Sequence, residues 1–569
     1  MIKAGEPDEL NAGSFFMFEK QDFERMIGKY IGRCFFAGKN ESDSKFGGDT
    51  MYSSIGKLFD LAADKDRDKE ALADVSRGIR RTFSEWKTDV HQCANALFAA
   101  GIRKGDRVST FLFNCAELAT VFFACAKIGA VLNPINFRLK SQEAAFILTD
   151  CSPKLVLFEK ALEAEIDALH EQFPHTLFWS IDAGQPSYAS YYREKVKEAP
   201  ASEVEADVNE DDLYAIMYTS GTTGRPKGVL HRHRDMIDQA MVCAMALRLT
   251  PNDCGLVAAP MFHCAELHCS FLPRVLIGAK NVIIHHFDPK QVLDVIKKDQ
   301  ITIMFGAPTM WNMLLQEDLK AADFSSMRVG LYGAAPMAPV LVKALKETVG
   351  IDFVQAYGMT EMGPAVTFLA EDEQLSKAGS AGRVCFGHEL IIVRPNEEGP
   401  SEPDDRLEPY EVGEILVKGP SIMAGYHQRP DASEKALYKG WYHSGDLGYL
   451  DKDGYLFVAD RLHDMIISGG ENVYPREVED ALHEHEGVLD AAVLGEPDDK
   501  WGETVVAYIV KKNPDLTEDD LEAFCKNGSR LAAYKRPRKY IFTDQLPRNA
   551  SGKIQKFMLR EQLAAHTEA

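Results

Sequence analysis

Short apolar runs alternate with longer amphipathic stretches between residues 51 and 460. Short continuous apolar runs are typical of strands buried on both faces, and amphipathic stretches of ten or more residues are typical of helices that cover a sheet. This alternation predicts a parallel α/β sheet. The predicted strands lie at 154–158, 281–284, 301–305 and 328–332, and the amphipathic stretches at 161–173 and 289–299.

The pattern changes after residue 396. Residues 397–411 are acidic and rich in proline, which is typical of a surface loop. Two later apolar runs, at 414–417 and 455–458, predict strands of a smaller β unit. The remainder predicts a small α+β domain of roughly a hundred residues. Its predicted helices are 475–485 and 518–531, and its predicted strands are 489–494 and 503–510.

Composition limits the class of protein. The 569 residues are too many for one hydrophobic core, so we expect two or more domains. A formal net charge of −22 argues against nonspecific binding to nucleic acid or to an anionic membrane. No apolar run approaches the roughly 18 residues of a membrane span. Eleven cysteines without paired spacing favour reduced thiols and a cytoplasmic location, and charged residues interrupt the apolar residues 15–18 where a secretory signal would lie.

The segment Tyr218-Thr-Ser-Gly-Thr-Thr-Gly-Arg-Pro-Lys-Gly228 has the chemistry of a phosphate-binding loop. Glycines let backbone N–H groups converge on an anion, hydroxyl groups add donors, and the Lys227 ammonium group adds positive charge. The spacing differs from a Walker A loop, because Lys227 is followed by glycine instead of serine or threonine. A flexible surface turn is the alternative interpretation.

This loop resembles the signature loop of the adenylate-forming (ANL) superfamily, which includes acyl-CoA synthetases, luciferases and nonribosomal adenylation domains. Further segments resemble the other motifs of that family in the family's order, and the resemblance covers roughly residues 55–562. They are Tyr-Gly-Met-Thr-Glu at 357–361, Tyr-His-Ser-Gly-Asp-Leu-Gly at 442–448, Asp-Arg at 460–461 leading into 468–475, and Pro-Arg-Asn-Ala-Ser-Gly-Lys at 547–553. The chain is therefore identified as a member of this family.

The resemblance implies a large N-terminal domain with parallel α/β subdomains and a small β subdomain, followed by a small, mobile α+β C-terminal domain. The expected ranges are 51–461 for the N-terminal domain and 462–569 for the C-terminal domain. Residues 1–50 precede the resemblance and are treated as an N-terminal extension of unknown role. The family commonly has Asp or Lys at the hinge, where this chain has His463. Because a hinge depends on backbone freedom, simple tolerance of this histidine is favoured over a pH-sensitive rotation.

The resemblance also implies ATP and Mg²⁺ as ligands and assigns catalytic roles. Lys553 is implied to neutralise charge that develops between the carboxylate and the α-phosphate, and Thr360 to contact that phosphate. Glu361 is implied to be catalytic as the Mg²⁺ ligand. The implied ATP- and AMP-binding residues are Thr219, Ser220, Gly221, Thr222, Thr223, Gly224, Lys227, Gly333, Ala334, Ala335, Pro336, Tyr357, Gly358, Asp446 and Arg461.

Within that set, Tyr357 is implied to stack on adenine, while Asp446, assisted by Arg461, is implied to accept hydrogen bonds from the ribose. The small residues at 333–336 let a base approach the backbone, although a tight turn after a strand needs the same residues. This turn is the weakest of the implied nucleotide contacts.

The acyl group and coenzyme A are implied to use other segments. His263 and Trp311 are implied to border the acyl pocket, and Gly469 and Gly470 to line the channel for the pantetheine arm. A basic cluster at 535–539 is interpreted either as a solvated loop, which is favoured, or as a contact for the phosphates of coenzyme A. Histidines and cysteines at 263–269 fit no standard zinc spacing, so we expect no metal there.

The implied function is that of an AMP-forming acyl-CoA synthetase, an acid–thiol ligase. The candidate acyl-pocket segments are 262–269, 305–311, 330–332 and 366–369. They are largely apolar and carry no evident cation for a second carboxylate, which favours a medium- or long-chain fatty acid. An aryl acid of the benzoate or cinnamate type is the alternative acid. A stand-alone adenylation enzyme that loads a carrier protein is the alternative function. The physiological pathway and the oligomeric state stay open, with a homodimer as one alternative.

Overall fold

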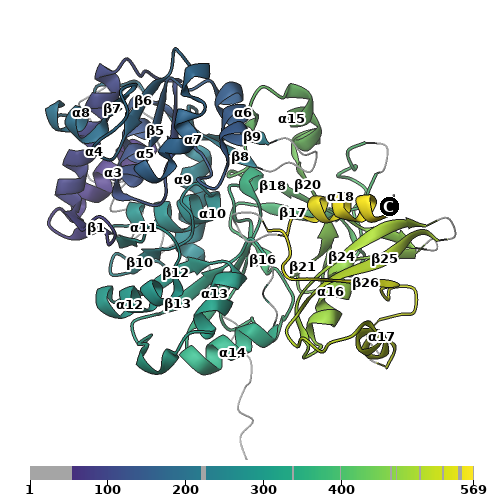
Figure 1. Ribbon diagram of the computed structural model, residues 1–569. Coiled ribbons are helices and arrows are strands. Elements are labelled where there is room, and N and C mark those ends of the chain that lie inside the picture. The colour runs from purple at the N-terminus through teal and green to yellow at the C-terminus, as the bar shows by residue number, and fades with distance from the viewer. Residues whose placement is uncertain are drawn as a thin grey trace, which may run out of the picture. The chain divides into compact units, whose positions relative to one another are not determined.

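The computed structural model describes residues 54–219, 226–335, 337, 339–396, 399–461, 464–468, 471–498, 501–527, 531–548 and 554–567. These residues belong to one compact unit, Tyr52–Ala569 (Figure 1). Within the described ranges, no helix combines the length and apolar character needed to cross a membrane.

An eight-stranded sheet has the order β19-β9-β8-β4-β3-β5-β6-β7. Neighbours from β8 to β7 run parallel, whereas β9 and β19 are antiparallel. The strands are β3 Arg107–Phe111, β4 Val131–Pro134, β5 Leu155–Phe158, β6 Leu177–Ser180, β7 Ala189–Tyr191, β8 Leu213–Thr219, β9 Lys227–Arg232 and β19 Gly425–Tyr426. The accompanying helices are α3 Ile55–Lys65, α4 Phe83–Ala99, α5 Ala116–Ile128, α6 Ser141–Cys151, α7 Glu163–Asp167, α8 Tyr192–Glu198 and α9 His233–Ala246.

A nine-stranded sheet has the order β16-β15-β14-β13-β12-β10-β11-β1-β2. The strands from β14 to β1 run parallel, and β2, β15 and β16 are antiparallel. The strands are β1 Glu70–Asp74, β2 Ile79–Thr82, β10 Cys254–Val257, β11 Lys280–Ile283, β12 Ile303–Gly306, β13 Val329–Tyr332, β14 Asp352–Tyr357, β15 Thr367–Leu369 and β16 Arg383–Val384. The helices are α10 Cys264–Glu266, a π-helical turn Leu267–Phe271, α11 Leu272–Leu276, α12 Pro289–Asp299, α13 Pro308–Leu315 and α14 Pro339–Val349.

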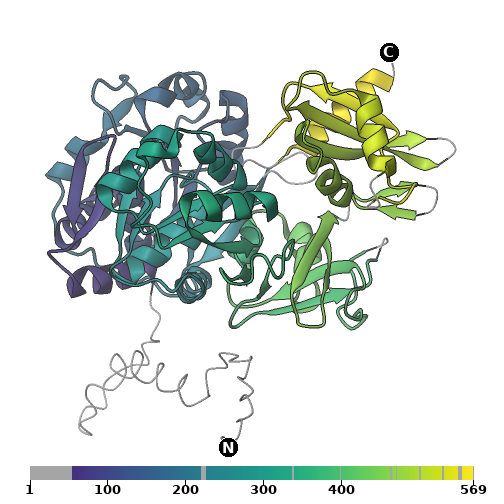
Figure 2. The ribbon, with the colours of Figure 1, turned by 90° about the horizontal axis from the view of Figure 1, so that it is seen from below.

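Two smaller sheets complete the described chain. An antiparallel sheet has the order β17-β18-β20-β21, with strands β17 Glu389–Val393, β18 Gly413–Lys418, β20 Tyr442–Leu450 and β21 Leu456–Arg461 and helix α15 Pro430–Ala436. The C-terminal elements, coloured yellow-green to yellow in Figure 2, are β22 Ile466–Ser468, β23 Glu471–Val473, α16 Pro475–His483, β24 Val488–Asp498, β25 Gly502–Lys511, α17 Glu518–Asn527, β26 Lys539–Thr543 and α18 Lys556–Thr567. They enclose cores of their own. The expected fold class is thereby confirmed.

Local chemistry explains why one predicted helix is accurate and another is wrong. Helix α12 begins where Asp288 accepts a hydrogen bond from the Gln291 backbone N–H at 2.8 Å, and Pro289 supplies the first helical residue. The predicted helix at 161–173 is instead broken into three short turns. Its backbone leaves the helical region at Leu162 and Leu169, because φ there is −111° and −128°. The apolar side chains of this range that recur at helical spacing are therefore buried although the range forms no continuous helix.

The domain boundaries stay a prediction. Leu462 and His463 lie outside the described residues, as do residues 1–50. The structure describes α17 over Glu518–Asn527 of the predicted helix 518–531, and residues 528–530 lie outside the described residues.

A fully buried ion pair spans the π-helical turn. Glu266 and Arg274 are each 0% exposed, and an Arg274 Nη2 donates to Glu266 Oε1 at 3.0 Å. Burial raises the pKa of the Glu266 carboxyl and lowers the pKa of the Arg274 guanidinium, because desolvation disfavours both charged forms. The attraction between the two groups offsets part of this desolvation cost. The Arg274 side chain also fills the space above Gly255, where an added Cβ would lie 2.3 Å from it.

Buried neutral histidines lie beside this turn. His231 is 0% exposed and packs edge-to-face on His268 with ring centroids 5.4 Å apart. Burial lowers the pKa of His231 to about 3 and the pKa of His233 to about 4. It also moves the pKa of His268, which bonds the Tyr214 hydroxyl, well below its ordinary value. These imidazoles are therefore neutral at neutral pH.

We expect Arg274→Met to lower the free energy of unfolding by about 3–5 kcal/mol, because it leaves the Glu266 carboxyl buried without its partner. Urea unfolding measures the effect. The matched control is Arg81→Met, whose half-exposed pair with Asp89 at 2.6 Å should contribute at most about 1 kcal/mol. A second variant, Glu266→Leu with Arg274→Met, should recover most of the loss; equal stability of Arg274→Met and Arg81→Met would contradict the account.

The buried histidines predict acid sensitivity. Their pKa values are lower in the folded than in the unfolded protein, so the unfolded state binds more protons below about pH 6.5 and stability falls as pH falls. We expect His231→Gln to reduce the slope of unfolding free energy against pH by about 1.4 kcal/mol per pH unit between about pH 6 and 5. Denaturant titrations across this range measure the slope. The exposed His175→Gln should leave it unchanged, and an unchanged slope in His231→Gln would refute the prediction.

Candidate active site

Three of the sequence motifs begin where a strand ends. The phosphate-loop segment follows β8, Gly333 follows β13 and Gly358 follows β14. In open parallel sheets, ligands bind beyond the carboxyl ends of the strands. The loop connects β8 to the antiparallel β9, and Thr219 lies opposite Lys227 in that pair. Of the predicted loop contacts, Ser220, Gly221, Thr222, Thr223 and Gly224 lie outside the described residues.

The structure joins the predicted adenine and ribose contacts. The Tyr357 hydroxyl donates to Asp446 Oδ2 at 2.7 Å, which links the end of β14 to β20. Asp446 is 5% exposed, and its backbone N–H donates to Ser444 Oγ at 3.0 Å. Asp446 also lies opposite Arg461 in the β20–β21 register, although the Arg461 side chain lies outside the description. Tyr357, Asp446 and the Arg461 backbone therefore gather in one place.

Thr360 and Glu361 lie in a short 3₁₀ turn after β14, and both are buried. The turn ends at Gly363, whose φ of +107° favours glycine. Glu361 Oε1 accepts a hydrogen bond from the Tyr426 hydroxyl at 3.0 Å. Thr360 Oγ1 lies 3.2 Å from the thiol sulfur of Cys264. Both side chains are thus held by neighbours from other segments.

Lys227 is connected to Glu361 through Tyr426. The Lys227 Nζ lies 4.7 Å from the centroid of the Tyr426 ring, and the hydroxyl of the same ring bonds Glu361. Sequence reasoning missed Tyr426, because a tyrosine in a Gly-Tyr pair belongs to none of the recognised motifs. Only its pairing with β9, where Tyr426 lies opposite Val229, brings it to the loop.

Two motif glycines are required by the backbone itself. A Cβ on Gly358 would lie 1.9 Å from the carbonyl oxygen of Pro364, and its φ is +153°. A Cβ on Gly333 would lie 2.7 Å from the carbonyl oxygen of Ala356. Close packing of the chain explains these glycines without a ligand. Ala334 and Ala335 follow Gly333, and Pro336 lies outside the described residues.

The two predicted acyl-pocket residues have different surroundings. His263 caps α10, with Nδ1 accepting from the Ala265 N–H at 3.2 Å, and burial lowers its pKa to about 4. Trp311 is 1% exposed and packs edge-to-face on Phe353 with ring centroids 4.9 Å apart. A Cβ on Gly306 would lie 2.9 Å from Trp311 Nε1.

Trp311, on α13, packs against one face of the nine-stranded sheet. Met304, Tyr332 and Phe353 pack with Trp311, whereas their neighbours along the strands pack against the other face. That second cluster also contains Cys269 of the π-helical turn, with Ala265 packed against it. Trp311 and the neighbours of His263 at Ala265 and Cys269 therefore lie in different hydrophobic clusters, and the assignment of Trp311 to the acyl pocket stays a prediction.

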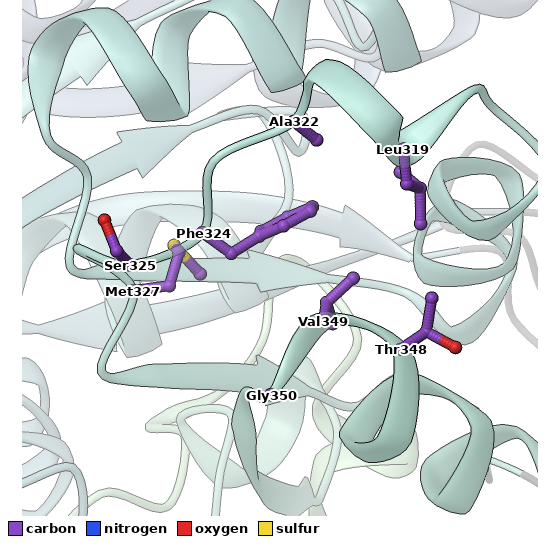
Figure 3. Close-up of a pocket in the computed structure, with 8 residues that line it drawn as sticks. All are labelled: Leu319, Ala322, Phe324, Ser325, Met327, Thr348, Val349 and Gly350. Carbon is purple, nitrogen blue, oxygen red and sulfur yellow. The ribbon is translucent and has the colours of Figure 1, made fainter.

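A cavity of about 320 Å³ lies at the opposite end of the strands (Figure 3). Its walls include Met327, just before β13, and Gly350, just before β14, whereas the motifs follow the carboxyl ends of these strands. We therefore separate this cavity from the candidate active site. Its lining residues are Leu319, Ala322, Phe324, Ser325, Met327, Thr348, Val349 and Gly350.

The donor set at the turn after β14 suits Mg²⁺. Magnesium is usually held by one or two carboxylates together with waters and substrate phosphates. Glu361 beside the end of the phosphate loop fits that mode. Within the described ranges, no group of three or more His, Cys, Asp or Glu side chains forms a metal cage.

Several predicted residues stay predictions, because they lie outside the described residues. They are the catalytic Lys553, the channel residues Gly469 and Gly470, and the hinge residue His463.

Comparison with known proteins identifies the family. Residues 59–427 match the model of the AMP-binding enzyme family, and residues 477–553 match the model of the AMP-binding enzyme C-terminal domain. The chain belongs to the AMP-binding enzyme family. The resemblance to adenylate-forming enzymes is thereby confirmed, and with it the prediction that the chain is a ligase.

Relatives differ in the acid that they are named for. The chain is 37% identical over 502 residues to the long-chain-fatty-acid–CoA ligase FadD13 of Mycobacterium tuberculosis, covering 87% of this chain and 96% of that protein. It is 38% identical over 493 residues to a feruloyl-CoA synthase of an Amycolatopsis species, covering 85% and 94%.

A solved relative has been determined with an acyl adenylate and with ATP and magnesium. The o-succinylbenzoate CoA synthetase MenE of Bacillus subtilis, bound to the acyl-adenylate OSB-AMP, has a TM-score of 0.78 at 34% identity, covering 88% of this chain and 97% of that one. The same enzyme with ATP and a magnesium ion has a TM-score of 0.77 at 34% identity, covering 88% and 99%.

We expect Tyr357→Phe to raise the KM for ATP about tenfold, because Asp446 loses a charge-assisted hydrogen bond while the ring face remains. Steady-state kinetics at varied ATP measure this. Tyr508→Phe is the matched control, since its hydroxyl donates to the Leu559 carbonyl at 3.2 Å in the C-terminal elements. A KM within about twofold of wild type in Tyr357→Phe would contradict the role.

Proposed function

We propose that the enzyme converts a medium- or long-chain fatty acid to its coenzyme A ester through an acyl adenylate. The observation that carries this proposal is the arrangement of Lys227, Tyr426 and Glu361, which brings the end of the phosphate loop to a buried carboxylate. The hydrogen bond from Tyr357 to Asp446 supports a nucleoside-binding site close to this turn, because Tyr357 precedes the turn by three residues.

In the first step, a carboxylate oxygen attacks the α-phosphorus of ATP and pyrophosphate leaves. We assign the loop 219–227 to the departing phosphates and Thr360 to the α-phosphate. Bound at Glu361, Mg²⁺ would supply positive charge to the phosphates. Lys553, outside the described residues, would add an ammonium group where charge develops between the two anions.

In the second step, the thiol of coenzyme A attacks the acyl carbonyl carbon and AMP leaves. We assign Asp446 and Arg461 to the ribose, and Gly469 and Gly470 to the channel for the pantetheine arm. His463 would be the hinge for rotation of the C-terminal domain between the steps.

The choice of a fatty acid rests on apolar surroundings and on one named relative. The cluster beside the π-helical turn contains Cys269, Phe305, Leu331 and Val354, none of which offers a cation to a second carboxylate. FadD13 is named for long-chain fatty acids. The feruloyl-CoA synthase favours an aryl acid as the second candidate.

The cellular setting is part of the proposal. The cysteines of the described ranges are free thiols, which supports a reducing compartment such as the cytoplasm. A homodimer is the proposed alternative to a monomer, and sedimentation equilibrium distinguishes them.

The test is pyrophosphate release from ATP with octanoate, palmitate, ferulate, benzoate or an amino acid, with and without coenzyme A, and thioesters detected by mass spectrometry. We expect kcat/KM for palmitate to exceed that for ferulate about tenfold or more, because an apolar pocket discriminates by buried methylene groups. Preference for ferulate or benzoate would replace the fatty acid with an aryl acid. Pyrophosphate without a thioester would indicate a carrier-protein acceptor.

Lys553→Ala serves as the control that separates the steps. It should slow adenylate formation about 10²–10³-fold and leave thioester synthesis from supplied acyl-AMP near wild type.

A further inference from the structure

We propose that Tyr426 is a positioning residue that fixes the Glu361 carboxylate and the Lys227 ammonium group relative to each other, and so sets the affinity for metal-bound ATP. The inference rests on the proposed role of Glu361. Its basis is that one side chain makes both contacts: the hydroxyl donates to Glu361 Oε1 at 3.0 Å, and the ring centroid lies 4.7 Å from Lys227 Nζ.

Strand pairing brings the ring to Lys227. Tyr426 lies directly opposite Val229 in the antiparallel pair of β19 and β9. Lys227 precedes Val229 by two residues, so the side chains of Lys227 and Val229 lie on the same face of β9. The ring of Tyr426 and the Lys227 side chain are therefore diagonal neighbours, which is the spacing that long side chains span.

The backbone of Tyr426 is held from several sides. Its N–H donates to Ser433 Oγ at 2.9 Å, and the side chain is 8% exposed within a core that includes Val229 and Met362. Three residues earlier, the Met423 N–H donates to the carbonyl oxygen of Glu361 at 2.9 Å. The same short segment thus contacts both the backbone and the side chain of Glu361, and its tyrosine has little freedom to move.

This geometry leaves both charged groups able to bind ligand. A carboxylate accepts about four hydrogen bonds or metal contacts, so the Tyr426 hydroxyl uses only part of that capacity. An ammonium group over an aromatic face retains its N–H donors for phosphate oxygens. Carboxylates that bind metals are commonly oriented by a second hydrogen bond, and loss of that partner typically weakens metal binding about 10–100-fold.

Two substitutions separate the contacts. Tyr426→Phe removes the hydroxyl and keeps the ring, whereas Tyr426→Leu removes both. The probe is Mn²⁺ in the presence of α,β-methylene-ATP, with free Mn²⁺ measured by electron paramagnetic resonance, so that binding is observed without turnover. We expect Tyr426→Phe to raise the Kd for Mn²⁺ about tenfold.

Calorimetry with α,β-methylene-ATP and EDTA isolates the contact to Lys227. We expect Tyr426→Phe to bind this analogue like wild type and Tyr426→Leu to bind it roughly fivefold more weakly, because only the latter loses the aromatic face.

Tyr188→Phe is the matched control for the hydroxyl. Tyr188 also donates to a carboxylate, Asp167 Oδ1 at 2.6 Å, but on an exposed segment that the site does not use. It should leave the Mn²⁺ affinity within about twofold of wild type. Thermal unfolding of all variants distinguishes local loss of affinity from loss of folded protein.

The outcomes separate this inference from the proposed function. If Tyr426→Phe is folded and binds Mn²⁺ like Tyr188→Phe, the positioning role is overturned while the function stands. If Glu361→Gln also leaves Mn²⁺ binding unchanged, the metal-ligand role of Glu361 fails as well. Weak Mn²⁺ binding in both Glu361→Gln and Tyr426→Phe, with no further loss in the double variant, supports the inference.

Discussion

Two anions must be brought together in a protein that itself carries a formal net charge of −22. A carboxylate and the α-phosphate of ATP repel each other, and the overall field of the protein adds to that repulsion. Local groups therefore have to supply the positive charge. The described site contains Lys227, and one tyrosine hydroxyl donates a hydrogen bond to each of its carboxylates, Glu361 and Asp446.

The site is assembled from three sheets, and two tyrosines make the connections. Tyr357 on β14 of the nine-stranded sheet bonds Asp446 on β20 of the four-stranded sheet. Tyr426 on β19 of the eight-stranded sheet bonds Glu361 in the turn after β14. A tyrosine side chain is long enough to reach from one sheet to the next. Its hydroxyl donates a hydrogen bond without adding a positive charge. The proposed nucleotide site and the packing of the sheets thus use the same hydrogen bonds.

Much of this architecture could be predicted from the sequence, because strong local signals agreed with the final structure. The range 289–299 has a capping aspartate, a proline at its start and one apolar face, and it forms the expected helix. The range 161–173 has suitable spacing but no such cap, and it breaks into turns. The motifs at 357–361 and 442–448 predicted a nucleotide site, and the structure brings Tyr357 and Asp446 from these motifs into contact.

The sequence could not reveal contacts made by strand pairing at long range. Tyr426 and Lys227 are some two hundred residues apart in the sequence, and no local sequence pattern predicts their contact. The assignment of Trp311 to the acyl pocket stays a prediction. Trp311 lies on α13, and its indole packs with Met304, Tyr332 and Phe353 on one face of the sheet.

The position of Trp311 has a consequence for how this enzyme can change its substrate. Its indole occupies the space over Gly306 and, with Phe353, the space over Gly330, where an added Cβ would lie 2.5 Å from the Phe353 ring. One face of the central strands is therefore closed to redesign, since any larger residue there meets packed aromatic rings. On the other face, the cluster that contains Cys243 and Cys269 has small side chains, so larger residues there meet thiols instead of aromatic rings.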